Sequence, residues 1–301
     1  MKEIIKKTLS VIIIVCVIFG LVPTQKAQAY TRLSKEDLTM YEGESTRIKV
    51  KGSSKKFKWS SSNKSVATVD QTGKITAKTE GFAIIYAKIG KEKLSCSVDV
   101  LFNKEKALKS IRVTPGILLD GAMAFIQNNY IENVEVSISF AFYDKNGKIV
   151  YTDEAEYINV PKGNFCMERI YADVLENGIY SVDATISDVS KDYSVNKPSN
   201  ISLSNKNRTE DGIQLQVKNE CGQTISKARV TCIYWKDEDI VGCERSFIYD
   251  LPPYSRKFIT ISNPAFKKYE IDEYGDYDWD YVNINYDRYE LFVDYACYSK
   301  Y

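Results

Sequence analysis

The sequence predicts an all-β chain in which three β-sandwich (Ig-like) modules follow a signal peptide in tandem. Three observations support this prediction. Short runs of alternating apolar and polar residues, separated by Gly, Ser and Asn turns, extend over residues 33–100. Residues 120–165 align without a gap with the residues 91 positions later, which indicates a duplicated module. The first 29 residues have the composition of a secretory leader.

The N-terminus contains the parts of a signal peptide. A basic region with three lysines precedes an apolar run from Leu9 to Val22, and Ala27-Gln28-Ala29 has the small-x-small pattern that signal peptidase cleaves. The alternative is an uncleaved membrane anchor, but a run of about 14 residues is short for a hydrocarbon core roughly 30 Å thick. We therefore expect cleavage before Tyr30, export, and no membrane span in the mature chain.

Composition argues against several classes of function. Residues 30–301 contain 37 Lys and Arg against 39 Asp and Glu, so a nucleic-acid or anionic-membrane partner attracted by bulk charge is not expected. Histidine is absent, which removes Ser-His-Asp and Cys-His catalysis and the commonest zinc ligand. We expect no enzyme and no cofactor, with calcium as the one open case.

Six cysteines remain after cleavage, and none forms a CxxC pair, so a zinc site is not expected. Export permits disulfides. The last module holds four of the cysteines, which allow three connectivities, and one is left over in the middle module. The sequence does not choose among pairings of Cys166, Cys221, Cys232, Cys243 and Cys297. Cys96 falls on the apolar face of its predicted strand, and we expect a buried, unpaired thiol there.

The first module, residues 30–103, has the strand pattern of a sandwich. A turn is predicted at Asp70-Gln71-Thr72-Gly73, and Trp59 is predicted to pack between the sheets, because large aromatics in sandwich strands are usually buried. The runs WSSSN (59–63), SVATVD (65–70) and GKITA (73–77), in this order, resemble the bacterial Ig-like group 2 domain over residues 33–101. This resemblance implies an extracellular sandwich of the kind found in bacterial surface and adhesion proteins, without a catalytic site.

Residues 104–110 are interpreted as a charged linker at the start of the first repeat copy, residues 104–190, and the second copy covers residues 191–301. Eight of the 46 aligned positions are identical, and the apolar pattern of residues 134–150 is repeated in residues 225–241. Asn146-Gly147 predicts a hairpin in the first copy. The run FYDKNGKIV (142–150), followed by a turn at Pro161, resembles the FxLYD-type sandwich domain of bacterial envelope proteins. The second copy departs from that pattern at Trp235 and Glu238, so its assignment depends on the repeat.

The second copy contains an insertion. If Val182-Asp183-Ala184 corresponds to Val293-Asp294-Tyr295, the insertion is about 20 residues long and contains the acidic and aromatic segment EIDEYGDYDWDY (270–281). Inserted loops often carry function, but surfaces also tolerate them at little cost.

The acidic residues of the insertion raise the question of calcium. Asp276, Asp278 and Asp280 have the spacing that opens an EF-hand loop, but Tyr281 stands at the sixth position, where a glycine is normal. Position twelve is an Asp rather than a Glu, so we do not expect an EF-hand. A looser calcium site formed by Asp272, Asp276, Asp278 and Asp280 stays open, because hard cations favour clustered carboxylates.

The aromatic residues of the insertion are candidates for ligand contact: Tyr274, Tyr277, Trp279 and Tyr281. Tyr and Trp provide rigid contact area for sugar rings or a protein partner. The alternative is that they pack the edges of their own module. The apolar and polar faces exchange past Tyr281, which predicts a bulge or loop end there rather than a core strand.

These patterns together predict an exported, non-catalytic array for adhesion or ligand binding at a bacterial cell surface or in its matrix. The expected partner is a surface glycan, a wall polymer or a protein. A structural spacer or subunit of a surface assembly is the alternative. A glycosidase using Asp278 and Asp280 is a remote alternative, because two acids on one small loop lack the opposed cleft that such chemistry needs.

Overall fold

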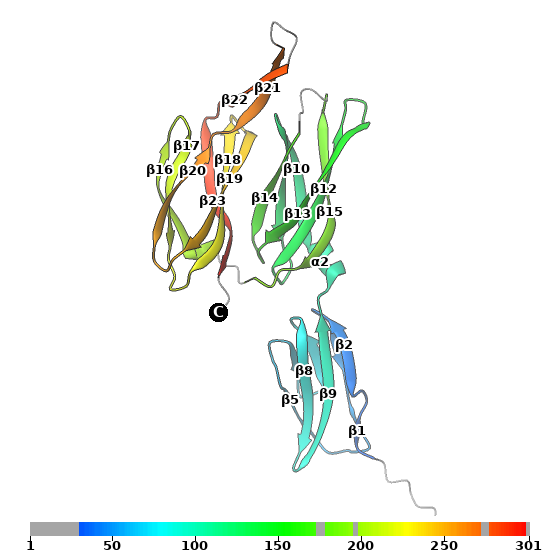
Figure 1. Cartoon of the computed structure of the whole chain (residues 1–301). Helices are drawn as coiled ribbons and strands as arrows, with labels where there is room; N and C mark the ends of the chain where they lie inside the picture. Colours follow the sequence, from blue (N-terminus) through cyan, green and yellow to red (C-terminus); the bar gives the residue numbers. More distant parts are fainter. Residues whose placement is uncertain (1–29, 173–177, 195–197, 272–276, 299–301) are drawn as a thin grey trace, which may run out of the picture. The chain divides into compact units, whose positions relative to one another are not determined.

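The computed structural model describes residues 30–172, 178–194, 198–271 and 277–298. It confirms the all-β class: within these residues the only helices are the α-helix α2 (Lys104–Ser110) and the 3-10 helix η1 (Pro198–Asn200). The chain divides into two compact units, Met1–Leu101 and Phe102–Tyr301 (Figure 1). No helix in the described part is long and apolar enough to cross a membrane. The predicted signal peptide lies outside the described residues.

The first unit consists of nine strands in its described part. They form a four-stranded sheet, a three-stranded sheet and a two-stranded sheet, in the orders β2-β9-β8-β5, β3-β7-β6 and β1-β4. The strands are β1 (Arg32–Leu33), β2 (Asp37–Tyr41), β3 (Ser45–Arg47), β4 (Val50–Lys51), β5 (Lys58–Ser61), β6 (Ala67–Val69), β7 (Lys74–Ala77), β8 (Gly81–Ile89) and β9 (Glu92–Leu101). β2 pairs parallel with β9, and the other pairs are antiparallel.

The core of this unit confirms three predictions. Trp59 is 8% exposed and packs in the core, and Cys96 is buried with a free thiol. The turn at residues 70–73 closes with a hydrogen bond from Gly73 N to Asp70 O at 3.1 Å. Gly73 has φ +78°, and a Cβ there would lie 2.3 Å from Ile48 O, so this turn requires glycine.

The second unit begins with a helix where a linker was predicted, so that interpretation was wrong. Asn103 caps α2, because its side chain accepts a hydrogen bond from Lys106 N at 3.0 Å. Ala107 is buried in the core of the first repeat copy, which anchors the helix. Only one residue of this charged seven-residue run is buried, so its sequence lacks the apolar periodicity from which a helix is predicted.

The two repeat copies have the same topology. In the first, sheets β10-β11-β14 and β13-β12-β15 are formed by β10 (Ile111–Leu118), β11 (Gly121–Asn128), β12 (Val134–Tyr143), β13 (Ile149–Val160), β14 (Phe165–Tyr171) and β15 (Ser181–Lys191). In the second, sheets β16-β17-β20 and β19-β18-β23 are formed by β16 (Ile201–Arg208), β17 (Gly212–Asn219), β18 (Ile225–Lys236), β19 (Asp239–Leu251), β20 (Arg256–Ser262) and β23 (Arg288–Tyr298). Each copy has its own apolar core.

Two equivalent asparagines confirm the 91-residue repeat. The buried Asn128 amide donates to Glu132 O at 2.9 Å and to Val160 O at 3.0 Å. The Asn219 amide donates to the carbonyl groups of the equivalent residues, Gln223 at 2.8 Å and Leu251 at 3.1 Å. The same residue type therefore satisfies the same backbone groups in both sandwiches.

The predicted hairpin at Asn146-Gly147 is also confirmed. Gly147 has φ +80°, and its backbone N–H donates to Asp144 O at 3.0 Å.

Strand register corrects the extent of the insertion. Phe140 and Thr231, which are 91 residues apart, pair with Ala184 and Phe292, which are 108 residues apart. The insertion is therefore 17 residues long, and Val182-Asp183-Ala184 corresponds to Glu290-Leu291-Phe292 rather than to Val293-Asp294-Tyr295. The local Val-Asp identity was misleading because Asp294 occupies a bulge in β23, which the sequence pattern does not reveal.

Candidate functional site

The insertion forms a two-stranded ribbon, β21 (Ala265–Ile271) and β22 (Tyr277–Asn283) (Figure 1). Its backbone register is continuous from Ala265 opposite Asn283 to Ile271 opposite Tyr277. The predicted bulge near Tyr281 was therefore wrong. The prediction assumed that one face of the strand covers a core, but the ribbon is a separate sheet, and Asp280, Tyr281 and Val282 are all exposed.

Most of the predicted site residues fall where side chains are not described. Asp272, Tyr274 and Asp276 lie outside the described residues, and for Tyr277, Asp278 and Trp279 only the backbone is described. Tyr281 is 62% exposed, and its backbone N–H donates to the Asp280 carboxylate at 2.7 Å. Within the described part of the chain, no group of His, Cys, Asp and Glu could hold a metal ion.

The structure reveals a different candidate, the interface between the two repeat copies. An apolar cluster contains Leu118, Met123 and Met167 of the first copy together with Ile233 and Cys243 of the second. Next to it, the rings of Phe165 and Phe292 lie 4.9 Å apart. Sheet β10-β11-β14 of the first copy thus packs against sheet β19-β18-β23 of the second.

A buried arginine of β14 connects the copies. The Arg169 guanidinium forms ion pairs with Asp120 of its own copy and with Glu244 of the other, and it donates to Cys243 O at 2.9 Å. Arg169 is only 5% exposed. Such a contact fixes the position of both partners, because a buried charge that loses its partner costs several kcal/mol.

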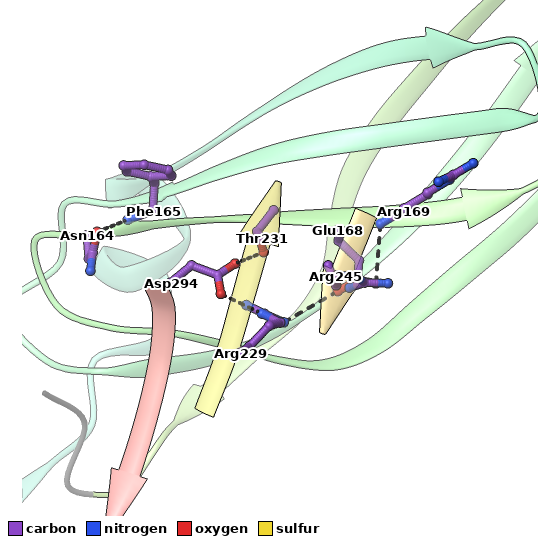
Figure 2. Close-up of polar contacts among 8 residues, drawn as sticks. All are labelled: Asn164, Phe165, Glu168, Arg169, Arg229, Thr231, Arg245 and Asp294. Atoms are coloured by element: carbon purple, nitrogen blue, oxygen red, sulfur yellow. Dashed lines mark hydrogen bonds and ion pairs between the residues drawn. The ribbon is translucent and has the colours of Figure 1, made fainter. Parts of the chain in front are cut away.

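A second group of charges lies beside it (Figure 2). Arg229 Nε donates to Asp294 Oδ1 at 2.8 Å, and Thr231 donates to Asp294 Oδ2 at 3.1 Å. Glu168 of the first copy lies 2.5 Å from Arg245 Nη1 and 3.8 Å from Arg229 Nη1 of the second. Three arginines and four carboxylates from both copies therefore form one network.

Burial controls the electrostatics of this network. It raises the pKa of the Asp120, Glu244 and Asp294 carboxyl groups, although the facing arginines oppose that shift. The same carboxylates raise the pKa of Arg169 and Arg229 against the effect of burial. Both arginines therefore stay charged, and the network is held by ionic hydrogen bonds.

A groove of about 390 Å³ opens over the network. Its wall contains Tyr157 from β13 of the first copy and Lys227, Arg245 and Phe247 from the second. Lys227 Nζ lies 5.0 Å from the Phe247 ring centroid. The groove thus combines aromatic surface with polar groups, which suits a ligand that has both apolar faces and hydroxyl or charged groups.

Tyr157 is the unusual residue of this groove. It is 71% exposed, and its φ of +57° places a bulky side chain in the left-handed region. The strain comes from a bulge, because β13 has two residues between Ala155 and Ile158 where β12 has one between their partners Ile138 and Val136. Backbone strain of this kind clusters at functional sites, so Tyr157, which also lines the groove, is a candidate ligand contact.

The sequence analysis missed this site, although one signal was available. Arg229 aligns with Ile138 of the first copy, so a charge replaces a core residue in one copy only. A buried position that gains a charge in this way needs a partner, and Asp294 is that partner.

Residues 30–98 match the family model of the bacterial Ig-like domain (group 2), which confirms the resemblance predicted for the first module. No curated protein matches the chain. Among solved structures, domains 5–6 of the S-layer protein SbsC align with 52% of this chain and 97% of their own length, at 11% identity and a TM-score of 0.23. Red sea bream transglutaminase aligns with 70% of this chain and 37% of its own, at 9% identity and a TM-score of 0.20. At these scores the two alignments support no conclusion about function. The family match and the all-β fold fit an extracellular surface or structural protein.

Proposed function

We propose that the protein is an exported, non-catalytic adhesion or ligand-binding protein of a bacterial surface or matrix, and that the groove between the repeat copies binds a surface glycan. The observation that carries this proposal is the exposed, strained Tyr157 in a groove that also contains Phe247. The proposal includes cleavage before Tyr30, module boundaries at residues 30–103, 104–190 and 191–301, and FxLYD-type domains for the two copies.

The side chains of the groove suit sugar binding better than catalysis. Aromatic rings stack on the apolar faces of sugar rings, while Lys227 and Asn159 provide hydrogen-bonding groups for hydroxyls. Glu168 is already engaged in an ion pair with Arg245, as part of the network between the copies.

Binding on a glycan array tests the proposal. We expect Tyr157→Asn and Phe247→Ala each to lower binding at least tenfold, because stacking area is lost. Tyr254→Asn is the matched control, since Tyr254 also has a positive φ (+56°) and 66% exposure but does not line the groove. Equal binding by the wild type, Tyr157→Asn and Tyr254→Asn would refute the role of the groove.

The ribbon is a second proposed contact. Tyr274, Tyr277, Trp279 and Tyr281 would extend the binding surface, and Asp272, Asp276, Asp278 and Asp280 would bind calcium. Support comes from the exposure of Tyr281 and from the position of the ribbon outside both cores. Deletion of residues 270–281 should weaken glycan binding, and a calcium titration by calorimetry should lose its heat in the same variant. Unchanged binding and unchanged heat would contradict both roles.

A structural spacer or subunit of a surface assembly is the second candidate. The buried charge network favours it, because a rigid connection between two sandwiches is useful in a load-bearing protein. It predicts no soluble ligand on the array and stable co-purification with a partner protein.

A further inference from the structure

The mature chain is nearly neutral overall, but its first unit is basic. Residues 30–101 contain 14 Lys and Arg against 8 Asp and Glu, whereas residues 102–301 contain 23 against 31. The first unit therefore has a net charge of +6 and the second a net charge of −8. The near-neutral charge of residues 30–301 as a whole therefore does not describe how either unit attracts a charged partner.

Part of the positive charge surrounds a groove of about 730 Å³ in the first unit. The groove lies at the loop between β4 and β5, and the turn at Gln71 and Thr72 forms another part of its wall. Phe57 and Trp59, both buried, contribute its apolar part. The Gln71 amide is fixed by hydrogen bonds to the backbone of Trp59, at 3.3 Å and 3.2 Å, which holds the turn in place.

Four lysines line this groove: Lys49, Lys55, Lys56 and Lys58. All four are exposed, no carboxylate lines the groove with them, and none forms an ion pair within residues 30–101. Asp70 is adjacent in sequence, but its carboxylate accepts hydrogen bonds from the backbone N–H groups of Thr72 and Lys74 in its own turn. The positive charge of the groove is therefore uncompensated.

We propose that this groove binds a linear phosphodiester polymer, with phosphates on the lysines and small linking units that need only the little apolar surface that Phe57 and Trp59 leave exposed. Lysine ammonium groups bind phosphate as point charges, and the groove offers only such groups, because no arginine lines it for bidentate recognition. Several adjacent ammonium groups suit a polymer better than a single anion, because each repeat supplies one charge.

The groove favours a polyol phosphate chain over a nucleic acid. Proteins that bind single-stranded nucleic acids stack the bases on accessible aromatic rings. Phe57 and Trp59 are each 8% exposed, so their rings are not available as stacking platforms. A concave site with a buried apolar part also does not suit insertion into a lipid surface, which requires protruding apolar residues.

The test uses the mature chain and poly(glycerol phosphate) of defined length in a fluorescence binding assay. The groove variant is Lys55→Gln/Lys56→Gln/Lys58→Gln. The control is Lys64→Gln/Lys78→Gln/Lys91→Gln, which removes equal charge from exposed lysines of the same unit outside the groove. An exposed ammonium–phosphate contact is worth about two- to fivefold in affinity, so the groove variant should bind roughly tenfold or more weakly. The control should change affinity less than threefold, and the groove variant should show a weaker dependence on salt.

Equal losses in the two triple variants would overturn the proposal, because they would indicate attraction by net charge alone. Equal binding of a single-stranded oligonucleotide with the same number of phosphates would overturn the choice of a polyol phosphate. This site lies in a different unit from the groove with Tyr157, so glycan binding by the triple lysine variant separates the two proposals. Loss of polymer binding with intact glycan binding supports this inference independently of the other groove.

Discussion

Replacing Arg169 with Met removes the cation that connects the two repeat copies. The Arg169 side chain is 2% exposed, and the change leaves the Asp120 and Glu244 carboxylates without their buried partner. It also removes the hydrogen bond to Cys243 O. Breaking a buried ion pair by deleting one partner costs about 3–5 kcal/mol, so we expect a loss of about 4 kcal/mol in the free energy of unfolding.

Urea unfolding measures this loss through the fluorescence of Trp235, which packs against the apolar cluster of the interface. Trp59 and Trp279 are replaced by Phe in every sample, so that the signal comes from the interface alone. With a urea m-value of about 2–3 kcal/mol/M, the midpoint should fall by roughly 1.5 M.

Two further variants make the result interpretable. Arg112→Met changes an exposed arginine of the same copy and should shift stability by less than about 0.5 kcal/mol. Arg169→Met combined with Asp120→Leu and Glu244→Leu removes all three charges and should recover most of the loss, because apolar replacement of a whole buried pair is often neutral. If Arg169→Met unfolds at the same urea concentration as Arg112→Met, the network does not hold the copies together.

Three other predictions concern backbone, thiols and pH. Gly121→Ala should lower the free energy of unfolding by at least about 3 kcal/mol, since φ is +149° and a Cβ would lie 1.9 Å from Ile170 O. Gly147→Ala, where a Cβ would meet open space, should lower it by about 1 kcal/mol, and thermal unfolding compares the two variants. Alkylation of the native protein at pH 8 should label only Cys221 and Cys297 among the six described cysteines, because the other four are buried, and mass spectrometry counts the adducts. Burial raises the pKa of Glu244 in the folded state, so this group favours folding below its usual pKa and this contribution is lost as pH rises through the raised value. The stability advantage of the wild type over Glu244→Gln should therefore shrink from pH 4 to pH 7 in urea titrations, and a growing advantage would contradict the direction of the shift.

The fold could be predicted from the sequence because the strands of a sandwich alternate apolar and polar residues. Alternation and turn residues located the first unit, and Trp59 and Gly73 have the predicted roles because burial and positive φ constrain the residue type. The repeat was detectable because the backbone contacts of Asn128 and Asn219 require the same side chain.

The candidate sites could be predicted only in part. The groove between the copies depends on which faces of two sandwiches meet, and a sequence with a correct strand pattern does not contain that pairing. The strain at Tyr157 arises from a bulge, and nothing in the local pattern of β13 distinguishes that residue from an ordinary exposed position. The prediction of a bulge near Tyr281 failed for a different reason. It assumed that one face of the strand covers a core, and β22 belongs to a separate two-stranded sheet.

The paired asparagines have a consequence for how a duplicated module can diverge. The aligned segments of the two copies retain only eight identical residues in 46, yet Asn128 and Asn219 bond equivalent carbonyl groups. Besides the shared apolar pattern, both copies therefore retain a few residues that fix the backbone, such as these asparagines and the glycines at 121 and 212. The remaining surface was free to change, so one ancestral module could supply both halves of an interface with itself.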